Sequence, residues 1–300
     1  MIPLFNKLVI VGVGLIGGSF ALALKRAGLV KHIVGVGRDQ ANLQTALKLN
    51  VIDSIAGEDD PANYGDADCV FIATPVGQMG PVMRAMAPHL PPHTLITDGG
   101  STKQDVVALA EANLGERIAR FVPGHPIAGA EKSGVEAAFA DLYVGKKTVL
   151  TATSRTASEA LLQAQAAWEA CGARVFKMSP AEHDAIFAAV SHLPHLLAFA
   201  LVDEIAAKPH AATLFDFAAS GFRDSTRIAG GHPEMWRDIL IANRAAVLTE
   251  LDAYTAHLAT LRAALVNADA DTLNAAFTRA RDARAAWLTR IEAGAAGPGA

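Results

Sequence analysis

The sequence has very little cysteine, few aromatic residues and no excess of basic charge. Only Cys69 and Cys171 occur among its 300 residues, and no C-x-x-C pair is present, which excludes a disulfide framework and a zinc or redox motif of that kind. Lys and Arg number 26 against 30 Asp and Glu, so binding of nucleic acid through a basic surface is not expected. Hydrophobic residues nevertheless make up 51% of the chain, which excludes a disordered protein and is enough for one large or two ordinary domains.

The first residues carry no recognisable secretion signal. In MIPLFNKLVIVG, Lys7 interrupts the apolar run and no small-residue cleavage site follows, so we expect a cytoplasmic protein. Residues 185–202 contain no Asp, Glu, Lys or Arg and are nearly long enough to cross a bilayer. Their centre reads SHLPH, from Ser191 to His195, and polar side chains with a helix breaker are unfavourable at that depth. We therefore expect a buried helix that carries functional side chains, and no membrane partner.

Strand-like and helix-like segments alternate in the first half of the chain. Short apolar runs predict strands at residues 8–11, 33–36, 69–73, 94–97, 148–150 and 174–176. Helices are expected at 19–27, closed by Gly28, and at 40–49. Strands that alternate with short helices are typical of βαβ units, so the sequence predicts an α/β domain with a mostly parallel sheet.

After Met178 the sequence indicates helices alone, with long Ala- and Leu-rich stretches at 237–266 and 268–292. We expect an α/β domain over 1–178, a helical domain over 179–293 and a disordered tail over 294–300. A self-contained helical bundle is one possibility. We favour a helical domain that completes its core by dimerising, because small side chains let helices approach closely and few aromatic residues make a thin core.

A glycine-rich turn follows the first predicted strand. Gly12-Val13-Gly14-Leu15-Ile16-Gly17 fits the G-x-G-x-x-G pattern and stands between a strand and a helix, which is the context of a dinucleotide-binding fingerprint. Gly12 would form the tight turn, Gly14 would let the backbone approach a pyrophosphate, and Gly17 would let helix and strand pack closely. The pyrophosphate would lie at the helix N-terminus, where free N–H groups favour an anion. The alternative is a glycine turn with a structural role only.

The tip of the second predicted strand bears on the choice of cofactor. A site specific for NAD places a carboxylate there to hold the ribose hydroxyls, but this chain has Gly37 followed by Arg38. Arg38 could hold a 2′-phosphate with its planar guanidinium, so we favour NADP and keep NAD as the alternative. Asp39 comes late for the ribose and could instead cap the next helix.

His125 and Ser101 are the candidate catalytic residues. His125 lies between Gly124 and Pro126, in non-helical backbone that can aim an imidazole, and removal of a hydroxyl proton during hydride transfer needs a base of this kind. Its alternative role is to hydrogen-bond a loop. Ser101 could orient the same hydroxyl, or it could be a helix N-cap.

Two further segments carry polar side chains among apolar residues. His192 and His195 are three apart and would share one face of a helix, whereas His183 would point the opposite way on a straight helix. No second cluster has metal-ligand spacing, so we expect no metal. In the segment 221–227, an Arg could bind a substrate carboxylate bidentately, or it could form a surface ion pair with Asp224.

Six ordered motifs together resemble the prephenate/arogenate dehydrogenase family over nearly the whole chain. They are GVGLIGGS from Gly12, ATPV at 73–76, Gly-Ser-x-Lys at 100–103, GHPIAGAEKSG from Gly124, SHLPH from Ser191 and GFRDSTRI from Gly221. The resemblance implies a Rossmann-type domain joined to a helical dimerisation domain, with the active site between them. It also implies that Thr74 and Pro75, like Leu15 and Ile16, belong to the cofactor site.

The reaction that this resemblance implies is oxidative decarboxylation of prephenate to 4-hydroxyphenylpyruvate, or of arogenate to tyrosine. His125 would accept the hydroxyl proton while hydride passes to NAD(P), and loss of carbon dioxide would make the ring aromatic. Ser101 would hydrogen-bond the hydroxyl, and Arg227 would bind the carboxylate.

The resemblance also implies a wider substrate site. His192 and His195 would line it, with His195 near the substrate side chain, where tyrosine would bind as a feedback inhibitor. Glu131 with Arg223 and Asp224 would form an ionic gate at the mouth of the site.

Two other functions stay open at this point. A β-hydroxyacid dehydrogenase of related architecture usually depends on a catalytic Lys in its helical domain, where this chain has only Lys208, beside Pro209. A non-catalytic NADP-sensing protein would bind the dinucleotide without turnover and would not need His125 together with Arg227. The motifs leave the choice between prephenate and arogenate open.

Overall fold

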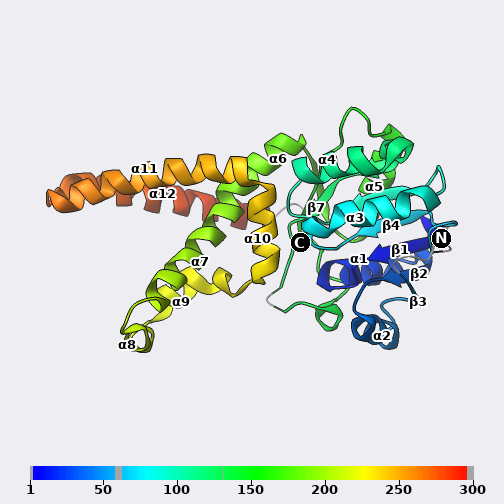
Figure 1. The fold of residues 1–300 in the computed structure, drawn as a ribbon. Helices are drawn as coiled ribbons and strands as arrows, with labels where there is room; N and C mark the ends of the chain where they lie inside the picture. Colours follow the sequence, from blue (N-terminus) through cyan, green and yellow to red (C-terminus); the bar gives the residue numbers. More distant parts are fainter. Residues whose placement is uncertain (1–2, 58–62, 131, 296–300) are drawn as a thin grey trace. The chain divides into compact units, whose positions relative to one another are not determined.

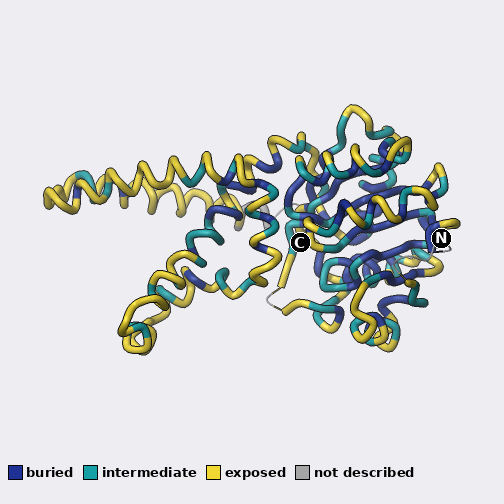
Figure 2. Tube along the Cα trace, viewed as in Figure 1, coloured by how far each residue is buried: buried dark blue, intermediate teal, exposed yellow. Residues whose placement is uncertain are grey.

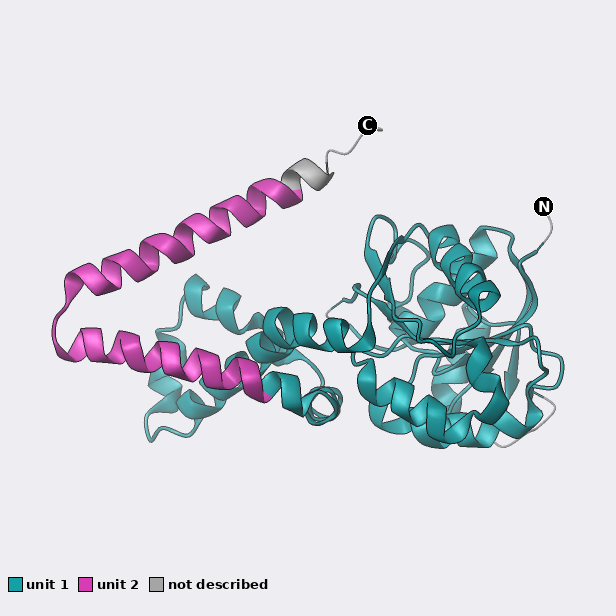
Figure 3. Cartoon of the chain, turned by 90° about the horizontal axis from the view of Figure 1, so that it is seen from above, with its two compact units in different colours: residues 1–247 teal, residues 248–300 magenta. Residues whose placement is uncertain are grey.

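A computed structural model describes residues 3–57, 63–130 and 132–295 of the chain. The chain divides into two compact units, Met1–Val247 and Leu248–Ala300 (Figure 3). This division lies within a helix, well after the domain boundary near Met178 that the sequence predicts, and the boundary stays a prediction. The change from alternating strands and helices to helices alone does follow the last strand, which ends at Lys177.

Six parallel strands form the main sheet of the first unit, in the order β3-β2-β1-β4-β5-β6 (Figure 1). Their bounds are β1 Phe5–Val11, β2 Val30–Val36, β3 Ser54–Ala56, β4 Cys69–Ile72, β5 Leu95–Asp98 and β6 Phe121–Val122. This is the strand order of the dinucleotide-binding Rossmann fold, in which ligands bind beyond the carboxyl ends of the strands. The predicted parallel α/β domain is therefore confirmed, although the sequence analysis did not predict β3.

Helices cover both faces of this sheet. They are α1 Leu15–Arg26, α2 Gln40–Lys48, α3 Val76–Met86, α4 Gln104–Asn113 and α5 Ser158–Ala170. Alternate side chains of β1 enter opposite cores: Leu8 and Ile10 pack with α1 and α5, while Val9 and Val11 pack with α3 and α4. Strands β4, β5 and β6 are accordingly buried along their whole length, and β1 and β2 are buried over their last four residues (Figure 2). The predicted helix at 19–27 begins four residues earlier, at Leu15, because the glycine turn leads directly into it.

A second, three-stranded sheet positions the candidate base. It consists of β7 (Gly124–Pro126), β8 (Lys147–Leu150) and β9 (Arg174–Lys177), with β7 antiparallel and β9 parallel to β8. His125 pairs with Val149 in this register, so its backbone is held in a strand rather than in a free loop. This confirms the expectation of rigid, non-helical backbone at His125.

The helical part of the first unit differs from the sequence prediction in two places. Its elements are α6 Pro180–Phe187, η5 Ala188–His192, α7 Leu193–Ala206, α8 Ala211–Asp216, α9 Ser220–Thr226, η6 Arg227–Gly230 and α10 Pro233–Ala242. The segment predicted as one helix over 185–202 contains a π-helical turn, η5, directly before Pro194. The stretch predicted as continuous from 237 to 266 breaks at Asn243, because the side chain of Asn243 bonds to the α6–η5 segment instead of facing solvent.

The run Pro180–Ala206 is long and apolar enough to cross a membrane, by length and composition alone. Only 22% of its most apolar window is buried inside this chain, so the expected buried helix is wrong for most of its length. Val190, for example, is 68% exposed. The buried part carries His183, Asp184 and His192, which all hydrogen-bond within the protein. Such paired polar groups fit a protein interior better than lipid.

The second unit contains most of α11 (Arg244–Val266) and all of α12 (Ala270–Ala295). Large apolar side chains on both helices are exposed in the single chain, including Leu265, Phe277 and Trp287 at 67%, 60% and 51%. Helix α12 continues through Ala295, into the tail expected at 294–300, and residues 296–300 lie outside the described residues.

Candidate active site

The glycine turn after β1 has the geometry of a phosphate-binding loop. Gly12 has a φ of +96°, and a Cβ there would lie 2.8 Å from the carbonyl carbon of Ala73. A Cβ at Gly17 would lie 2.3 Å from the carbonyl oxygen of Gly12, so both positions require glycine. Around Gly14, by contrast, no atom of the described residues lies within 4 Å of the Cβ position. Gly14 precedes α1 without a side-chain cap, which leaves room and N–H groups for a pyrophosphate.

Thr74 and Pro75 follow β4, the neighbour of β1 in the sheet, and lie against the glycine turn. The backbone N of Thr74 is 3.0 Å from the Cβ position of Gly12, and Pro75 is the N-cap of α3. Thr74 Oγ1 is buried and has no hydrogen-bond partner among the residues that the structure describes. A buried hydroxyl beside a phosphate-binding turn is consistent with the predicted place of Thr74 in a cofactor site.

The tip of β2 presents Arg38 but no available carboxylate. Asp39 is the N-cap of α2, and its Oδ1 accepts a hydrogen bond from the backbone N of Asn42 at 3.0 Å. The alternative role given to Asp39, a helix cap, is therefore confirmed. Arg38 is exposed directly after the strand, where a ribose would bind in a Rossmann fold.

A buried ion pair joins the end of β5 to β7. Asp98 and Lys103 are both fully buried, and Lys103 Nζ lies 2.5 Å from Asp98 Oδ2. Lys103 also donates to the carbonyl of Gly124 at 2.8 Å, while Asp98 Oδ1 accepts from the backbone N of Gly124 at 3.0 Å. The pair therefore fixes the strand residue next to His125 on both its N–H and its carbonyl.

His125 itself belongs to a line of hydrogen-bonded side chains. Its Nδ1 lies 2.8 Å from Nε2 of His183, and Nδ1 of His183 lies 2.8 Å from Oδ1 of Asp184. The side chain of Phe187 packs on both imidazole rings, with centroid distances of 4.9 Å and 4.4 Å. Asp184 in turn accepts the backbone N–H groups of Lys103 and Gln104, at 2.8 Å and 2.9 Å.

The imidazoles of this cluster are neutral at neutral pH. Burial, with smaller contributions from His183, Lys103 and His192, lowers the pKa of His125 well below 6.5. Burial also lowers the pKa of His183, against the opposing hydrogen bond to Asp184. For Asp184 burial by itself acts to raise the pKa, but the hydrogen bonds from His183, Gln104 and Lys103 outweigh it and lower the pKa overall. The cluster therefore combines neutral imidazoles with an ionised carboxylate.

His192 and Ser101 lie together at the turn after β5. Burial lowers the pKa of His192 to about 4, and a backbone hydrogen bond to Ser101 partly opposes that shift. The other ring nitrogen, Nδ1, accepts from Nδ2 of Asn243 at 3.1 Å. Helix α4 begins at Gln104 with Lys103 as its N-cap, so the alternative role of Ser101 as a helix cap is wrong. The geometry of His192 favours support of the Ser101 turn over direct contact with a substrate.

His195 and Arg227 lie close to one another beside α10. The His195 ring stacks on Trp236 at a centroid distance of 3.5 Å, and its Nδ1 donates to the carbonyl of Ser191. Burial lowers the pKa of His195, the Ser191 bond opposes this, and the charge of Arg227 lowers it further. His192 also faces Trp236, at 6.4 Å, so the two histidines do share one side of the helix.

The predicted ionic gate is only partly described. Arg223 and Asp224 form an exposed ion pair at 3.3 Å, which is the alternative that the sequence analysis gave for this segment. Glu131 lies outside the described residues. The participation of these three residues in a gate stays a prediction.

The sequence analysis missed His183, Asp184, Lys103 and Asn243. It placed His183 on the wrong side because it assumed a straight helix, whereas each residue of the π turn η5 advances less around the axis and brings His183 and His192 toward the same cluster. The Gly-Ser-x-Lys motif in the turn between β5 and α4 was the one local signal for Lys103. Among the residues that the structure describes, no group of three or more His, Cys, Asp or Glu could hold a metal ion.

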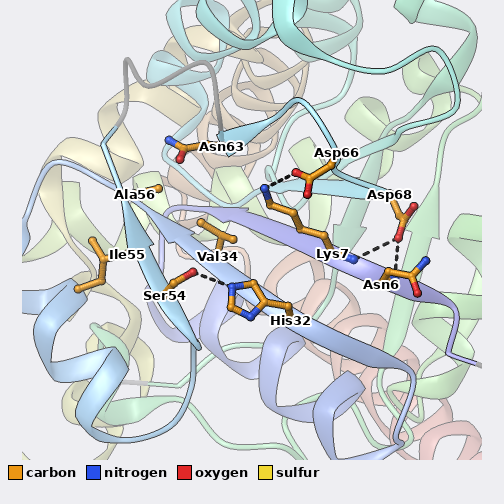
Figure 4. Close-up of a pocket in the computed structure, with 10 residues that line it drawn as sticks. All are labelled: Asn6, Lys7, His32, Val34, Ser54, Ile55, Ala56, Asn63, Asp66 and Asp68. Carbon is orange, nitrogen blue, oxygen red and sulfur yellow. Dashed lines mark hydrogen bonds and ion pairs between the residues drawn. The ribbon is translucent and has the colours of Figure 1, made fainter.

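A separate hollow of about 580 Å³ lies beside strands β1, β2 and β3 (Figure 4). Its polar groups are paired with one another: Lys7 with Asp66, the backbone N of Lys7 with Asp68, and His32 with Ser54. The lining comes from the amino end of β1, from β2 and β3, and from the residues before β4. It does not include the glycine turn, Thr74, Ser101 or His125, so this hollow is not the candidate active site.

Comparison with known proteins finds relatives over most of the chain. Residues 20–177 match the family described as "Prephenate dehydrogenase, nucleotide-binding domain", and residues 179–279 match "Prephenate dehydrogenase, dimerization domain". A prephenate dehydrogenase of Bacillus subtilis is 39% identical over 93% of this chain and 75% of its own length. A cyclohexadienyl dehydrogenase of Zymomonas mobilis is 35% identical over 95% of this chain and 97% of its own length.

A solved structure extends the likeness to three dimensions. The prephenate dehydrogenase of Aquifex aeolicus, in complex with hydroxyphenyl propionate and NAD+, has a TM-score of 0.84 and 36% identity, covering 96% of this chain and 98% of that one. The Rossmann strand order, the phosphate-binding turn and the buried His125 cluster stand in a chain whose two family matches cover most of its length. This chain belongs to the prephenate dehydrogenase family.

Proposed function

We propose that this chain oxidises the ring hydroxyl of prephenate or arogenate, with loss of carbon dioxide and transfer of hydride to NAD(P), as a step of tyrosine biosynthesis. The observation that carries the proposal is the placement of His125. The glycine turn, Thr74, Ser101 and His125 follow β1, β4, β5 and β6, four strands that are neighbours in the sheet. The carboxyl ends of these parallel strands lie at one edge, so a base and a phosphate-binding turn serve the same site.

The proposed roles follow from the chemistry of each side chain. His125 accepts the hydroxyl proton, and Ser101 holds that hydroxyl in place by a hydrogen bond. The glycine turn, Thr74 and Pro75 would hold the dinucleotide, which when bound would supply the acceptor for the hydride of the carbinol carbon. The resulting ketone is conjugated to the carbon that bears the ring carboxylate, so the bond to the carboxylate breaks, carbon dioxide leaves, and the electrons complete an aromatic ring. Arg227 binds a substrate carboxylate, and His195 faces the substrate side chain.

The test is reduction of the dinucleotide, followed by absorbance, with prephenate and with arogenate, each against NAD and NADP. Reduction with one pairing would support the reaction and also identify the side chain and the cofactor. If a folded protein that binds a dinucleotide reduced it with neither substrate, the proposal would be wrong. The remaining candidate functions would then be a β-hydroxyacid dehydrogenase and an NADP-sensing protein.

For the cofactor we propose NADP, because Arg38 stands at the tip of β2 and Asp39 is engaged as a helix cap. Replacing Arg38 with Ala should weaken NADP binding by about tenfold or more, the value of a charge-assisted hydrogen bond, and leave NAD binding unchanged. Titration of each dinucleotide measures this. The matched control is Lys48→Ala, which removes an exposed positive charge at the far end of α2. Equal losses for NAD and NADP would contradict a contact with the 2′-phosphate.

For the substrate carboxylate we propose Arg227. Arg227→Ala should raise the Michaelis constant about tenfold or more while dinucleotide binding stays unchanged, because a bidentate contact to a carboxylate is lost. Arg227→Lys should recover only part of the loss, since an ammonium keeps the charge but not the fork. Steady-state kinetics with Arg237→Ala, an exposed arginine of α10, provides the control. An unchanged Michaelis constant in Arg227→Ala would remove it from the substrate site.

We further propose that the protein acts in the cytoplasm as a homodimer built through its helical part. The family match to a dimerization domain and the exposed apolar side chains of α11 and α12 support the homodimer. Sedimentation equilibrium of the full chain should give twice the mass of 31.3 kDa. A monomer at all accessible concentrations would contradict the proposal.

Tyrosine is the proposed feedback ligand, since its side chain resembles the aromatic product and would fit beside His195. Tyrosine should inhibit competitively with the cyclohexadiene, and His195→Ala should weaken that inhibition. Inhibition that is absent, or that His195→Ala leaves unchanged, would remove this part of the proposal.

A further inference from the structure

Asp184, His183 and His125 form a continuous line of hydrogen bonds that ends at the candidate base. The two contacts between side chains are both 2.8 Å long. Asp184 and His183 are buried, and Phe187 closes one side of both imidazole rings. The line crosses from α6 to β7, elements that are far apart in the sequence, so the fold rather than local sequence brings the three side chains together.

The partners of each atom determine where the protons lie. Asp184 accepts backbone N–H groups on both of its oxygens, from Lys103 and Gln104, and these bonds favour the ionised carboxylate, in keeping with the lowered pKa of Asp184. A carboxylate can only accept, so Nδ1 of His183 carries the hydrogen in that contact. A neutral imidazole has one N–H, so Nε2 of His183 is an acceptor. The hydrogen between the two imidazoles therefore belongs to Nδ1 of His125, and its Nε2 holds a lone pair.

The charges around this line keep His183 and His125 neutral. Burial comes first in lowering the pKa of both rings, and the Lys103 ammonium adds to it. Other ionisable groups that face the line are Asp98, paired with Lys103, the neutral His192, and Asp105, whose pKa is raised by burial and in part by the charge of Asp184. The surroundings thus favour a single N–H on each ring. Because the Asp184 carboxylate can only accept, it determines which nitrogen donates in each hydrogen bond of the line.

We propose that Asp184 and His183 are positioning residues that hold His125 in the tautomer with hydrogen on Nδ1, so that the lone pair of Nε2 is directed to the substrate hydroxyl. This inference rests on the proposed role of His125 as the base. In the step it serves, the substrate O–H bond breaks and the proton forms a new N–H bond at Nε2 of His125. The positive charge that arises on His125 is then stabilised through Nδ1–H by His183, which the Asp184 carboxylate orients. No proton needs to pass beyond His125.

The surrounding structure makes this arrangement stiff. Asp184 caps the first turn of α4, and Asn243 donates both to the carbonyl of Asp184 and to His192. The wide turn η5 brings its own His192 to the same cluster as His183 and Asp184 of α6. Rotation of His183 away from His125 would leave buried polar atoms without partners, which is unfavourable.

The experiment compares the wild type with Asp184→Asn, His183→Gln and His183→Leu, using ¹⁵N NMR of the histidine rings and steady-state kinetics. In the wild type, the ring spectrum of His125, assigned through loss of its signals in His125→Asn, should show hydrogen on Nδ1 and none on Nε2. In Asp184→Asn the new amide can donate to Nδ1 of His183, which would reverse the direction of both hydrogen bonds and place the hydrogen of His125 on Nε2. Turnover should therefore fall about a hundredfold, within the 10²–10⁴ rate enhancement that a general base supplies. Dinucleotide binding should change less than about twofold, because the cofactor turn is not part of the line.

The two His183 variants separate positioning from a structural role. Gln can still accept the hydrogen of Nδ1 of His125, so His183→Gln should keep the tautomer and at least about tenfold more turnover than His183→Leu. Glu182→Gln is the matched control for Asp184→Asn, since Glu182 is an exposed carboxylate on the same helix. If Asp184→Asn does not fold, the His183 pair and the wild-type spectrum still decide the matter.

Three results would overturn the inference: hydrogen on Nε2 of His125 in the wild type, equal turnover in His183→Gln and His183→Leu, or undiminished turnover in His183→Leu. The ring spectrum requires no substrate. A wild type that turns over neither substrate would refute the proposed function, while the spectrum would still test the tautomer by itself.

Discussion

Replacing His125 with Asn should lower turnover by roughly two to four powers of ten, the usual share of a general base in an enzymatic rate. An amide of similar size can hydrogen-bond the substrate hydroxyl but cannot take its proton. The backbone at this position is held by the pairing of β7 with β8 and by the contacts of Asp98 and Lys103 to Gly124. The variant should therefore fold normally and bind the dinucleotide as the wild type does.

The measurement is turnover at saturating substrate and dinucleotide, together with a dinucleotide titration. His89→Asn makes the same chemical change at an exposed position after α3 and should leave both quantities unchanged. Near-normal turnover in His125→Asn would show that another group takes the proton, and the proposed mechanism would then be wrong.

The Lys103→Met variant should lose about 3–5 kcal/mol of unfolding free energy, the cost of leaving one partner of a buried ion pair without the other. Lys103 and Asp98 are both fully buried, so water cannot solvate the carboxylate that remains. Met fills a volume close to that of the Lys side chain, which keeps the loss of packing small. The carbonyl of Gly124 also loses a donor, so the strand that carries His125 becomes less firmly held.

Urea unfolding of the variant and the wild type measures this difference. Lys208→Met is the control, because Lys208 and Glu204 form an exposed pair on α7 and such pairs contribute about 0–1 kcal/mol. The double variant Asp98→Asn/Lys103→Met should recover part of the loss, since the uncompensated charge is gone. A Lys103→Met protein within about 1 kcal/mol of the wild type would contradict a stabilising role for this pair.

The sequence could predict the nucleotide-binding half because its signals are local. Four apolar residues between turn-forming residues are enough to indicate a buried parallel strand, as at Cys69–Ile72. The glycine turn could be predicted for the same reason. The φ angle of Gly12 and the short distance between Gly17 and the backbone of Gly12 depend on residues a few positions apart. The short strand β3 was missed because three half-buried residues leave almost no pattern.

The helical half was harder to predict from the sequence, because its helix break and its π turn depend on residues that are distant in the sequence. The break at Asn243 follows from bonds to the carbonyl of Asp184 and to His192, more than fifty residues earlier, and no local breaker marks it. On a regular α-helix, with a constant rotation per residue, His183 and His192 would point in opposite directions. The π turn between them reduces the rotation per residue and brings the two side chains toward the same side.

By itself the sequence determined the parallel sheet, the glycine turn after β1 and the non-helical backbone at His125, because each depends on neighbouring residues; the pairing that places His125 in strand β7 comes from the tertiary structure. Only the tertiary structure decided which partners His125 has. Asp98, Lys103, His183 and Asp184 come from three separate elements, and a hydrogen-bonded line of buried side chains forms only when the chain folds those elements against one another. The direction of a hydrogen bond and the pKa of a buried group depend on burial and on the partner atom, which here lies less than 3 Å away. The spacing of residues in the sequence determines neither the burial nor the partner atom.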